Sequence, residues 1–324
     1  MKVSRPNLSI FKNVSFFYKY GLYFLFIFLI IIFSILSKDF LTFDNIIYIL
    51  LLTAPYGVSV VGMTFVILTA GIDLSVGSIV FASGVTAIIC GNAGFGVIVS
   101  ILAALATGMI VGSLNGLLIS KWKIVPFLNT LATMMLVRGV ALLYSSEGFV
   151  VIDDPRFMEV VTQWKLLGIP IIIYVFIIIA IVGQIILRKT PIGWHLYAIG
   201  NNPMAAQKIG IHVNRLILLV YMICGTLAGL SGFIQVSLVG AVTSNFGTGQ
   251  EFTIISATVL GGVSLFGGKG KILPGAVIGI LIFTIIENAL VLISANPYFY
   301  TIIRGLVIFL AVMLDSITNK GELR

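Results

Sequence analysis

Three ionisable side chains lie inside long apolar segments of the sequence: Arg138, Glu287 and Arg304. If these segments alternate across a membrane, all three lie at a similar depth, about 8–9 Å below the outer boundary at about 1.5 Å per residue. A charge at that depth needs a partner. We therefore expect an Arg–Glu ion pair that joins the segment of Glu287 to that of Arg304 or Arg138. The pair could be structural, with the second arginine extending to the interface, or it could contact a solute.

Four amide side chains add neutral polarity to the apolar segments: Asn115, Asn129, Gln235 and Asn288. Amides offer both donors and acceptors, which suits a neutral polyhydroxy solute better than a charged one. We therefore treat them as candidate lining residues of a translocation path. For Asn115, an interhelical hydrogen bond is the simpler interpretation.

A stripe of small residues, Gly108, Gly112 and Gly116, places Asn115 on nearly the same helix face. Small residues at this spacing let helix backbones approach closely. The stripe predicts a helix-contact surface, either within the chain or between subunits.

Asp73 and Ser75 follow Gly71 at a break between two apolar runs. Either side chain could cap the helix that starts near Val76, because Asp and Ser are preferred N-cap residues. The alternative is a polar contact in a pathway or with a cytoplasmic partner.

No motif for catalysis or cofactor binding is found. The stretch 262–270, GVSLFGGKG, resembles a phosphate-binding loop, but its spacing is one residue too long and Gly270 replaces the Ser or Thr that would hold magnesium. His195 and His212 have no neighbouring ligand set, and the two cysteines lie in apolar segments without metal or redox spacing. We expect no catalytic residue, no metal and no cofactor in this chain.

The composition explains where these residues must sit. The chain has 324 residues, of which 59% are hydrophobic and 9% are charged, whereas soluble domains carry about 25% charged residues. Repeated apolar runs near 20 residues indicate an all-α polytopic membrane protein. Ten candidate spans follow: 21–37, 46–70, 75–90, 96–120, 124–144, 169–187, 213–237, 251–267, 272–293 and 299–316. The third and eighth are short and could be re-entrant.

The charge distribution predicts the orientation. With both termini in the cytoplasm, 14 of the 19 Lys and Arg residues fall on the cytoplasmic side, as the positive-inside rule requires. This bias also accounts for the net charge of +8 without a nucleic-acid partner.

The longest internal polar stretch, 187–215, contains the signals of one short helix. Asn202 suits the N-cap, Pro203 the first helical position and Gly210 the C-terminal cap. A helix this short is unstable alone in water, so it should be docked on a partner. The region 187–197 is expected to continue from the sixth span.

Two Gly-containing breaks suggest that the chain has two loosely similar halves. The stretches 64–83 and 253–271 each combine an apolar helix, a break on the cytoplasmic side and a Gly-rich continuation. Paired broken segments indicate a translocation path, although glycine can also serve helix packing alone.

Several motifs then resemble one family, the bacterial permeases for ribose, xylose, arabinose and galactose. They occur in the same order and cover the chain from about residue 40: TAGIDLSVGS (69–78), GSLNGLLI (112–119), PFLNTLATMMLVRG (126–139), YAIGNNPMAAQKIGI (197–211), GTLAGLSG (225–232), VLGGVSLFGGKG (259–270) and PYFYTIIRGLVIFLAVMLD (297–315).

The resemblance implies the permease subunit of an ATP-binding-cassette importer in a bacterial inner membrane. Such permeases pair with a second copy or a paralogue, are driven by two cytoplasmic ATPases and receive solute from an extracytoplasmic binding protein. By resemblance, the coupling helix that contacts the ATPase consists of Asn201, Asn202, Pro203, Met204, Ala205, Ala206, Gln207, Lys208, Ile209 and Gly210.

The predicted organisation has five parts: a cytoplasmic tail (1–20), a first transmembrane half (21–187), a cytoplasmic loop (188–212), a second transmembrane half (213–316) and a cytoplasmic tail (317–324). The expected function is import of a sugar, most simply a monosaccharide, with membrane lipid around the chain. Two alternatives remain open: an ion-coupled secondary transporter with Glu287 as proton carrier, and a membrane scaffold or receptor that recruits a cytoplasmic partner.

Overall fold

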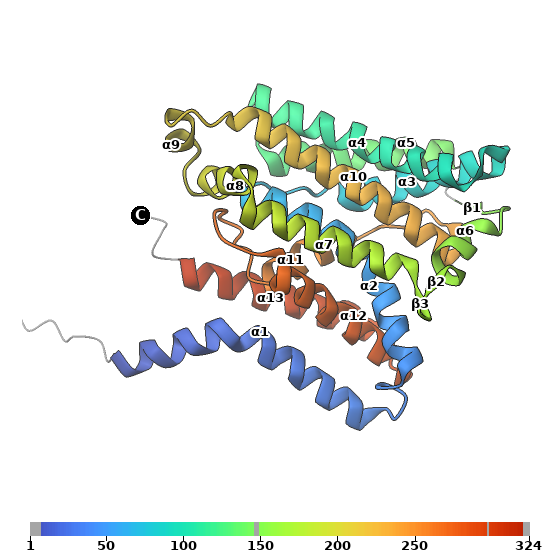
Figure 1. Ribbon diagram of the computed structural model, residues 1–324, viewed down its shortest axis with the longest axis horizontal. Helices are drawn as coiled ribbons and strands as arrows, with labels where there is room; N and C mark the ends of the chain where they lie inside the picture. The colour runs from blue at the N-terminus through green and yellow to red at the C-terminus, as the bar shows by residue number, and fades with distance from the viewer. Residues whose placement is uncertain (1–7, 146–148, 297, 320–324) are drawn as a thin grey trace, which may run out of the picture.

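The computed structural model describes residues 8–145, 149–296 and 298–319, with side chains described from residue 21 onward except at 311 and 314–319. The long helices lie side by side as a bundle (Figure 1). They are α1 (Leu8–Leu36), α2 (Phe43–Leu68), α3 (Val76–Cys90), α4 (Gly96–Trp122), α5 (Pro126–Tyr144), α7 (Ile171–Lys189), α10 (Val213–Val239), α12 (Val277–Leu292) and α13 (Tyr298–Asn319).

Shorter elements connect them. The short helices are α6 (Arg156–Met158), α8 (Pro191–Asn201), α9 (Pro203–Lys208) and α11 (Gln250–Leu260); the π-helical turns are η1 (Gly91–Phe95), η2 (Glu159–Gln163) and η3 (Ile272–Ala276). Two antiparallel pairs of two-residue strands also form: β1 (Val150–Val151) with β4 (Ala241–Val242), and β2 (Lys165–Leu166) with β3 (Ile169–Pro170).

The described helices include six stretches that are long and apolar enough to cross a membrane. An all-α membrane protein is therefore confirmed, whereas the count of ten spans is not. One of the six, Val76–Trp122, joins α3 and α4 across a kink at Gly94, where φ is +83°. The terminal segments are only partly covered, because α1 and α13 contribute the shorter apolar helices Gly21–Leu36 and Tyr298–Leu310. Helix α1 begins at Leu8, inside the predicted tail 1–20, and residues 320–324 of the other tail lie outside the described residues.

The centre of the bundle is α10, which packs on α4, α3 and α2. The glycine stripe of α4 makes this packing possible. A Cβ atom added at Gly108 would lie 2.1 Å from the carbonyl oxygen of Gly225, and one added at Gly112 would lie 2.3 Å from that of Tyr221. At Gly116 the nearest atom would be the Cα of Leu218, at 2.8 Å. The stripe is therefore a contact within the chain.

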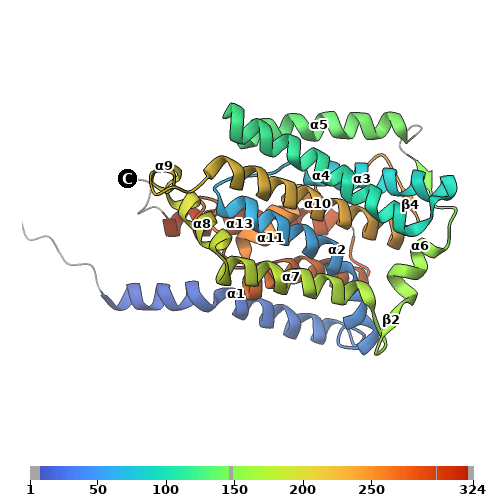
Figure 2. The same ribbon diagram turned by 45° about the horizontal axis from the view of Figure 1, so that its top comes forward.

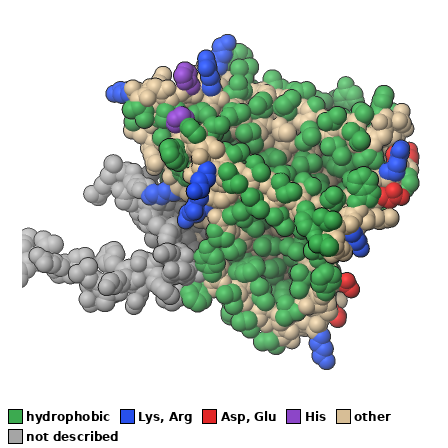
Figure 3. Space-filling view, viewed as in Figure 1, with side chains coloured by type: hydrophobic (Ala, Val, Ile, Leu, Met, Phe, Trp, Pro, Cys, Tyr) green, Lys and Arg blue, Asp and Glu red, His purple; other side chains and the backbone are tan. Residues whose placement is uncertain are grey.

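The two ends of the bundle differ in structure and charge. Helices α8 and α9 form one end, and the strand pairs lie at the other (Figures 1 and 2). In Figure 3, apolar side chains cover the middle of the visible face. Both histidines and several basic side chains lie near α8 and α9, and the acidic side chains on this face lie toward the strand end, where further basic side chains accompany them.

Candidate translocation path and coupling surface

A buried chain of hydrogen bonds connects the break before α3 with α4 and α5. Ser75 Oγ donates to Asp73 Oδ1 at 2.5 Å, and Asn115 Nδ2 donates to Ser75 Oγ at 2.9 Å. Asn115 Oδ1 accepts from Asn129 Nδ2 at 2.9 Å and from Thr133 Oγ1 at 2.7 Å. Four of the predicted path residues thus form one cluster, in which Asn115 bridges the two helices and the break.

Capping explains only part of this cluster. Ser75 occupies the N-cap position of α3, yet its side chain makes no capping hydrogen bond. Asp73 Oδ1 accepts the backbone N–H of Ser75 at 2.9 Å, whereas its buried Oδ2 has no hydrogen-bond partner among the described residues. A buried polar atom without a partner is costly. The cluster therefore contains an acceptor that helix capping does not satisfy.

The two membrane arginines bind polar groups rather than Glu287. Arg138 donates to the backbone oxygens of Ser244 at 3.0 Å and Phe246 at 3.2 Å, and Arg304 donates to Thr253 Oγ1 at 3.3 Å. Neither arginine forms an ion pair with Glu287 in the described part of the chain. The prediction of a direct Arg–Glu pair is wrong. Sequence distance from a helix end gives depth, but it does not show that α11 and the loop before it supply closer acceptors.

Arg138, Arg304 and Glu287 are called the outer cluster below. Two further side chains of the same region are Tyr300 and Glu251. The guanidinium of Arg304 lies 5.5 Å from the centroid of the Tyr300 ring. Glu251 of α11 is buried, with 6% of its surface exposed. Glu251 was not among the predicted site residues, because it begins a predicted span. The signal that could have identified it is an acidic residue at the start of an apolar run.

The two remaining amides predicted for the path form reciprocal pairs with neighbouring segments. Gln235 and Gln250 exchange hydrogen bonds of 3.0 and 2.7 Å between α10 and α11. Asn288 and Asn45 exchange bonds of 2.8 and 3.1 Å between α12 and α2. Asn288 is thus engaged on the α2 side of α12 and does not join the Asp73 cluster.

Helix α9 forms with the caps that the sequence predicts. Asn202 Oδ1 accepts the backbone N–H of Ala205 at 3.0 Å, and Pro203 occupies the first turn. At the other end Gly210 adopts φ +88°, and its N–H donates to the carbonyl of Gln207 at 3.1 Å. Of the helix residues, Ala206 is buried, in a small apolar cluster with neighbours from α8 and α10.

The remaining surface of α9 is exposed. The side chains of Met204 and Ile209 are 75% and 76% exposed. The segment before α9 differs from its prediction as a continuation of the sixth span. It is a separate helix, α8, because Thr190 caps it by accepting from the N–H of Gly193 at 3.5 Å and Pro191 starts a new first turn.

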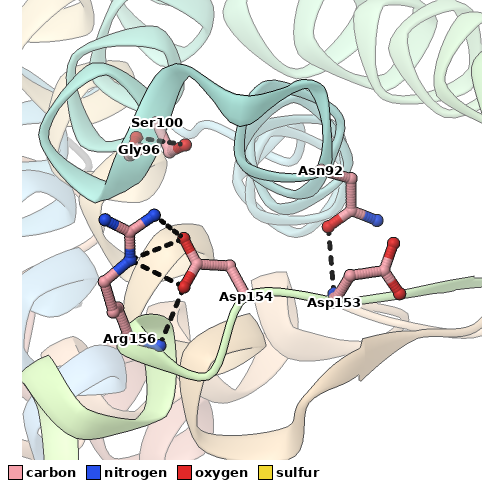
Figure 4. Close-up of polar contacts among 6 residues, drawn as sticks. All are labelled: Asn92, Gly96, Ser100, Asp153, Asp154 and Arg156. Carbon is pink, nitrogen blue, oxygen red and sulfur yellow. Dashed lines mark hydrogen bonds and ion pairs between the residues drawn. The ribbon is translucent and has the colours of Figure 1, made fainter.

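At the opposite end, the loop before α6 is fixed to the kink between α3 and α4 (Figure 4). Asn92 donates to the backbone oxygen of Val151 at 2.8 Å and accepts from the N–H of Asp153 at 3.0 Å. Asp154 and Arg156 form an ion pair of 2.7 Å, and this hydrogen-bonded guanidinium lowers the pKa of Asp154. The loop thus presents an ordered polar surface.

These features define a class of protein: a helical membrane permease with buried polar clusters inside the bundle and a short capped helix at its basic end. The chain belongs to the family described as branched-chain amino acid transport system / permease component, whose model matches residues 45–312.

Curated relatives cover nearly the whole chain. The ribose import permease protein RbsC of Escherichia coli K12 is 37% identical over 291 residues, 89% of this chain and 90% of the relative. RbsC of Bacillus subtilis is 38% identical over 290 residues, 89% of each chain. The L-arabinose transport system permease protein AraH of Escherichia coli K12 is 34% identical over 305 residues, 94% of this chain and 92% of the relative. No solved structure matches the chain.

Proposed function

We propose that this chain is the membrane-spanning permease subunit of an ATP-binding-cassette importer and that it carries a monosaccharide into the cytoplasm. The relatives named above are permeases for ribose and L-arabinose, and one from Azospirillum brasilense is named an L-arabinose ABC transporter permease. We call the buried cluster of Asp73, Ser75, Asn115 and Asn129 the inner cluster. Its amide and hydroxyl groups suit a neutral polyhydroxy solute, which needs hydrogen bonds rather than a counter-charge.

The chain is a transport subunit and not an enzyme in this proposal. ATP is hydrolysed on two cytoplasmic ATPase subunits, and an extracytoplasmic binding protein delivers the sugar to the strand end of the bundle. A second copy of the chain, or a paralogous permease, completes the path. The candidate path residues are those of the inner cluster (Asp73, Ser75, Asn115, Asn129), those of the outer cluster (Arg138, Glu287, Arg304), and the paired amides Gln235 and Asn288.

The topology in this proposal is that of a bacterial inner membrane protein with both termini in the cytoplasm. Ten segments in two loosely similar halves place most of the Lys and Arg residues on the side of α8 and α9. The basic side chains near α8 and α9, where Figure 3 shows no acidic side chain on the visible face, support this orientation.

One observation carries the coupling role: α9 buries Ala206 against the bundle and exposes Met204 and Ile209 at the basic end. Exposed apolar side chains on and beside a capped helix suit a protein partner, because burial of apolar surface favours association. Closure of the ATPases would displace α8 and α9 together, since Asn202 ends one helix and caps the other.

The proposal is tested by purifying the tagged chain from its native membrane and reconstituting the co-purified complex in liposomes. We expect an ATPase subunit in the complex and hydrolysis that rises with the binding protein plus D-ribose or L-arabinose. A chain that purifies without any ATPase and transports neither sugar would contradict the proposal.

A further inference from the structure

Three backbone segments are in direct contact at the α8–α9 end of the bundle, with no side chain between them at Gly200. Gly200, near the end of α8, is buried between the loop after α2 and the loop after α11. A Cβ atom added to Gly200 would lie 2.0 Å from the oxygen of Leu68, 2.2 Å from the nitrogen of Gly268 and 3.0 Å from the carbonyl carbon of Gly267. We call this contact the glycine junction.

The two loops are also joined to each other at the junction. The N–H of Gly268 donates to the carbonyl of Leu68 at 3.0 Å. A Cβ atom at Gly267 would lie 2.8 Å from the nitrogen of Ala70. The side chain of Asn201 fills the space above Gly268, and Tyr197 Oη donates to the carbonyl of Gly270 at 2.8 Å. Helix α8 therefore holds both loops at once.

Each segment continues into a different functional part. Helix α8 continues through Asn202 into α9. The loop after α2 continues within a few residues to Asp73 and the inner cluster. The loop after Gly268 continues into η3, where the N–H of Leu273 donates to Gln184 of α7 at 2.8 Å, and then into α12.

The close approach makes the junction stiff. The atoms nearest to Gly200 belong to backbone, which cannot rotate away as a side chain can. Packed protein interiors transmit displacement because they contain little free volume. A movement of α8 must therefore shift the two loops or break their contact.

We propose that the glycine junction transmits a displacement of α9 to both Gly-containing breaks, in the stretches 64–83 and 253–271, at the same time. Gly200 and Tyr197 are the positioning residues of this contact. This inference rests on the proposed function, because it needs α9 to receive force from an ATPase. Through this one contact, a movement of α9 would shift the inner cluster and the segment leading to α12 in the same step.

The test uses Gly200→Ala in the complete reconstituted complex with its ATPase and binding protein. We expect the ATPase to remain bound and basal hydrolysis to persist. Stimulation by the loaded binding protein and uptake of labelled D-ribose or L-arabinose, whichever the wild type transports, should fall about tenfold, within the usual range of coupling between sites. Gly21→Ala is the matched control, because a Cβ atom there meets nothing within 4 Å, and it should behave as wild type.

A second variant separates transmission from folding. Tyr197→Phe removes the hydrogen bond to Gly270 and keeps the ring, so the complex should assemble and lose part of its stimulation. Wild-type stimulation of ATP hydrolysis in Gly200→Ala would overturn the proposal that the junction transmits displacement. If Gly200→Ala fails to assemble, wild-type stimulation in Tyr197→Phe would overturn it. A wild-type chain that binds no ATPase refutes the proposed function itself, and with it the junction.

Discussion

The Nδ2 atom of Asn115 donates to Ser75 Oγ at 2.9 Å, which joins the middle of α4 to the loop where the first broken segment ends. Both side chains are fully buried. The same asparagine accepts hydrogen bonds from α5, so a single amide joins three segments, and Ser75 in turn contacts Asp73, whose Oδ2 has no partner within the described part of the chain. A displacement of the loop must therefore rearrange the polar interior of the bundle.

Replacing Asn115 by Leu should destabilise the protein. Nδ2 of Asn129 would lose its acceptor, whereas Ser75 and Thr133 would each lose one hydrogen bond and keep another. An unsatisfied buried group costs about 1–3 kcal/mol. Thermal unfolding of the detergent-solubilised protein measures this loss. Gln163→Ala, at an exposed amide, is the control and should unfold as wild type does. Equal unfolding temperatures for Asn115→Leu and the control would show that the amide is dispensable for stability.

The Asn45–Asn288 pair should show measurable coupling. Hydrogen bonds between membrane helices contribute about 0.6 kcal/mol on average and up to about 1.7 kcal/mol. A double-mutant cycle with Asn45→Ala and Asn288→Ala should give a coupling energy of this size. The same cycle with Asn45→Ala and Gln235→Ala should be additive, because these residues pair with different partners. Additivity in both cycles would contradict the pairing of α2 with α12.

Gly112→Ala should weaken the packing of α4 on α10. The added methyl group would lie 2.3 Å from the carbonyl oxygen of Tyr221, so the helices must separate. Overpacking of this kind costs about 1–3 kcal/mol. Gly139→Ala on α5 meets no atom within 4 Å and is the control. An unfolding temperature for Gly112→Ala at or above that of the control would exclude the close approach.

The sequence predicts helices better than it predicts their partners. Apolar length and the low fraction of charged residues were enough for the membrane class, and the caps at Asn202 and Gly210 were enough for α9. Helix α8 was missed although Thr190 and Pro191 carry the same signals, because the region 187–197 was assigned to the end of the sixth span. The partners of Arg138 and Arg304 could not be predicted, since periodicity gives the depth of a side chain but not which neighbouring segment offers the nearest acceptor.

Ala205→Glu should abolish uptake while leaving the chain inserted in the membrane. Ala205 is exposed in this chain, so the charge should not disturb the fold. It would become buried in the interface with the ATPase, where an unpaired charge is costly. Co-purification of the ATPase and sugar uptake measure the effect, and Ala205→Ser is the conservative control. Wild-type uptake in Ala205→Glu would remove α9 from the coupling surface.

The most direct test of ATP-driven import is to identify the energy source of transport. Uptake of labelled D-ribose and L-arabinose should be measured in cells under two treatments: a protonophore with ATP held constant, and ATP depletion with the membrane potential maintained. Uptake of the transported sugar should survive the protonophore and stop when ATP is depleted. Uptake that collapses with the protonophore and persists without ATP would contradict ATP-driven import and would favour an ion-coupled transporter.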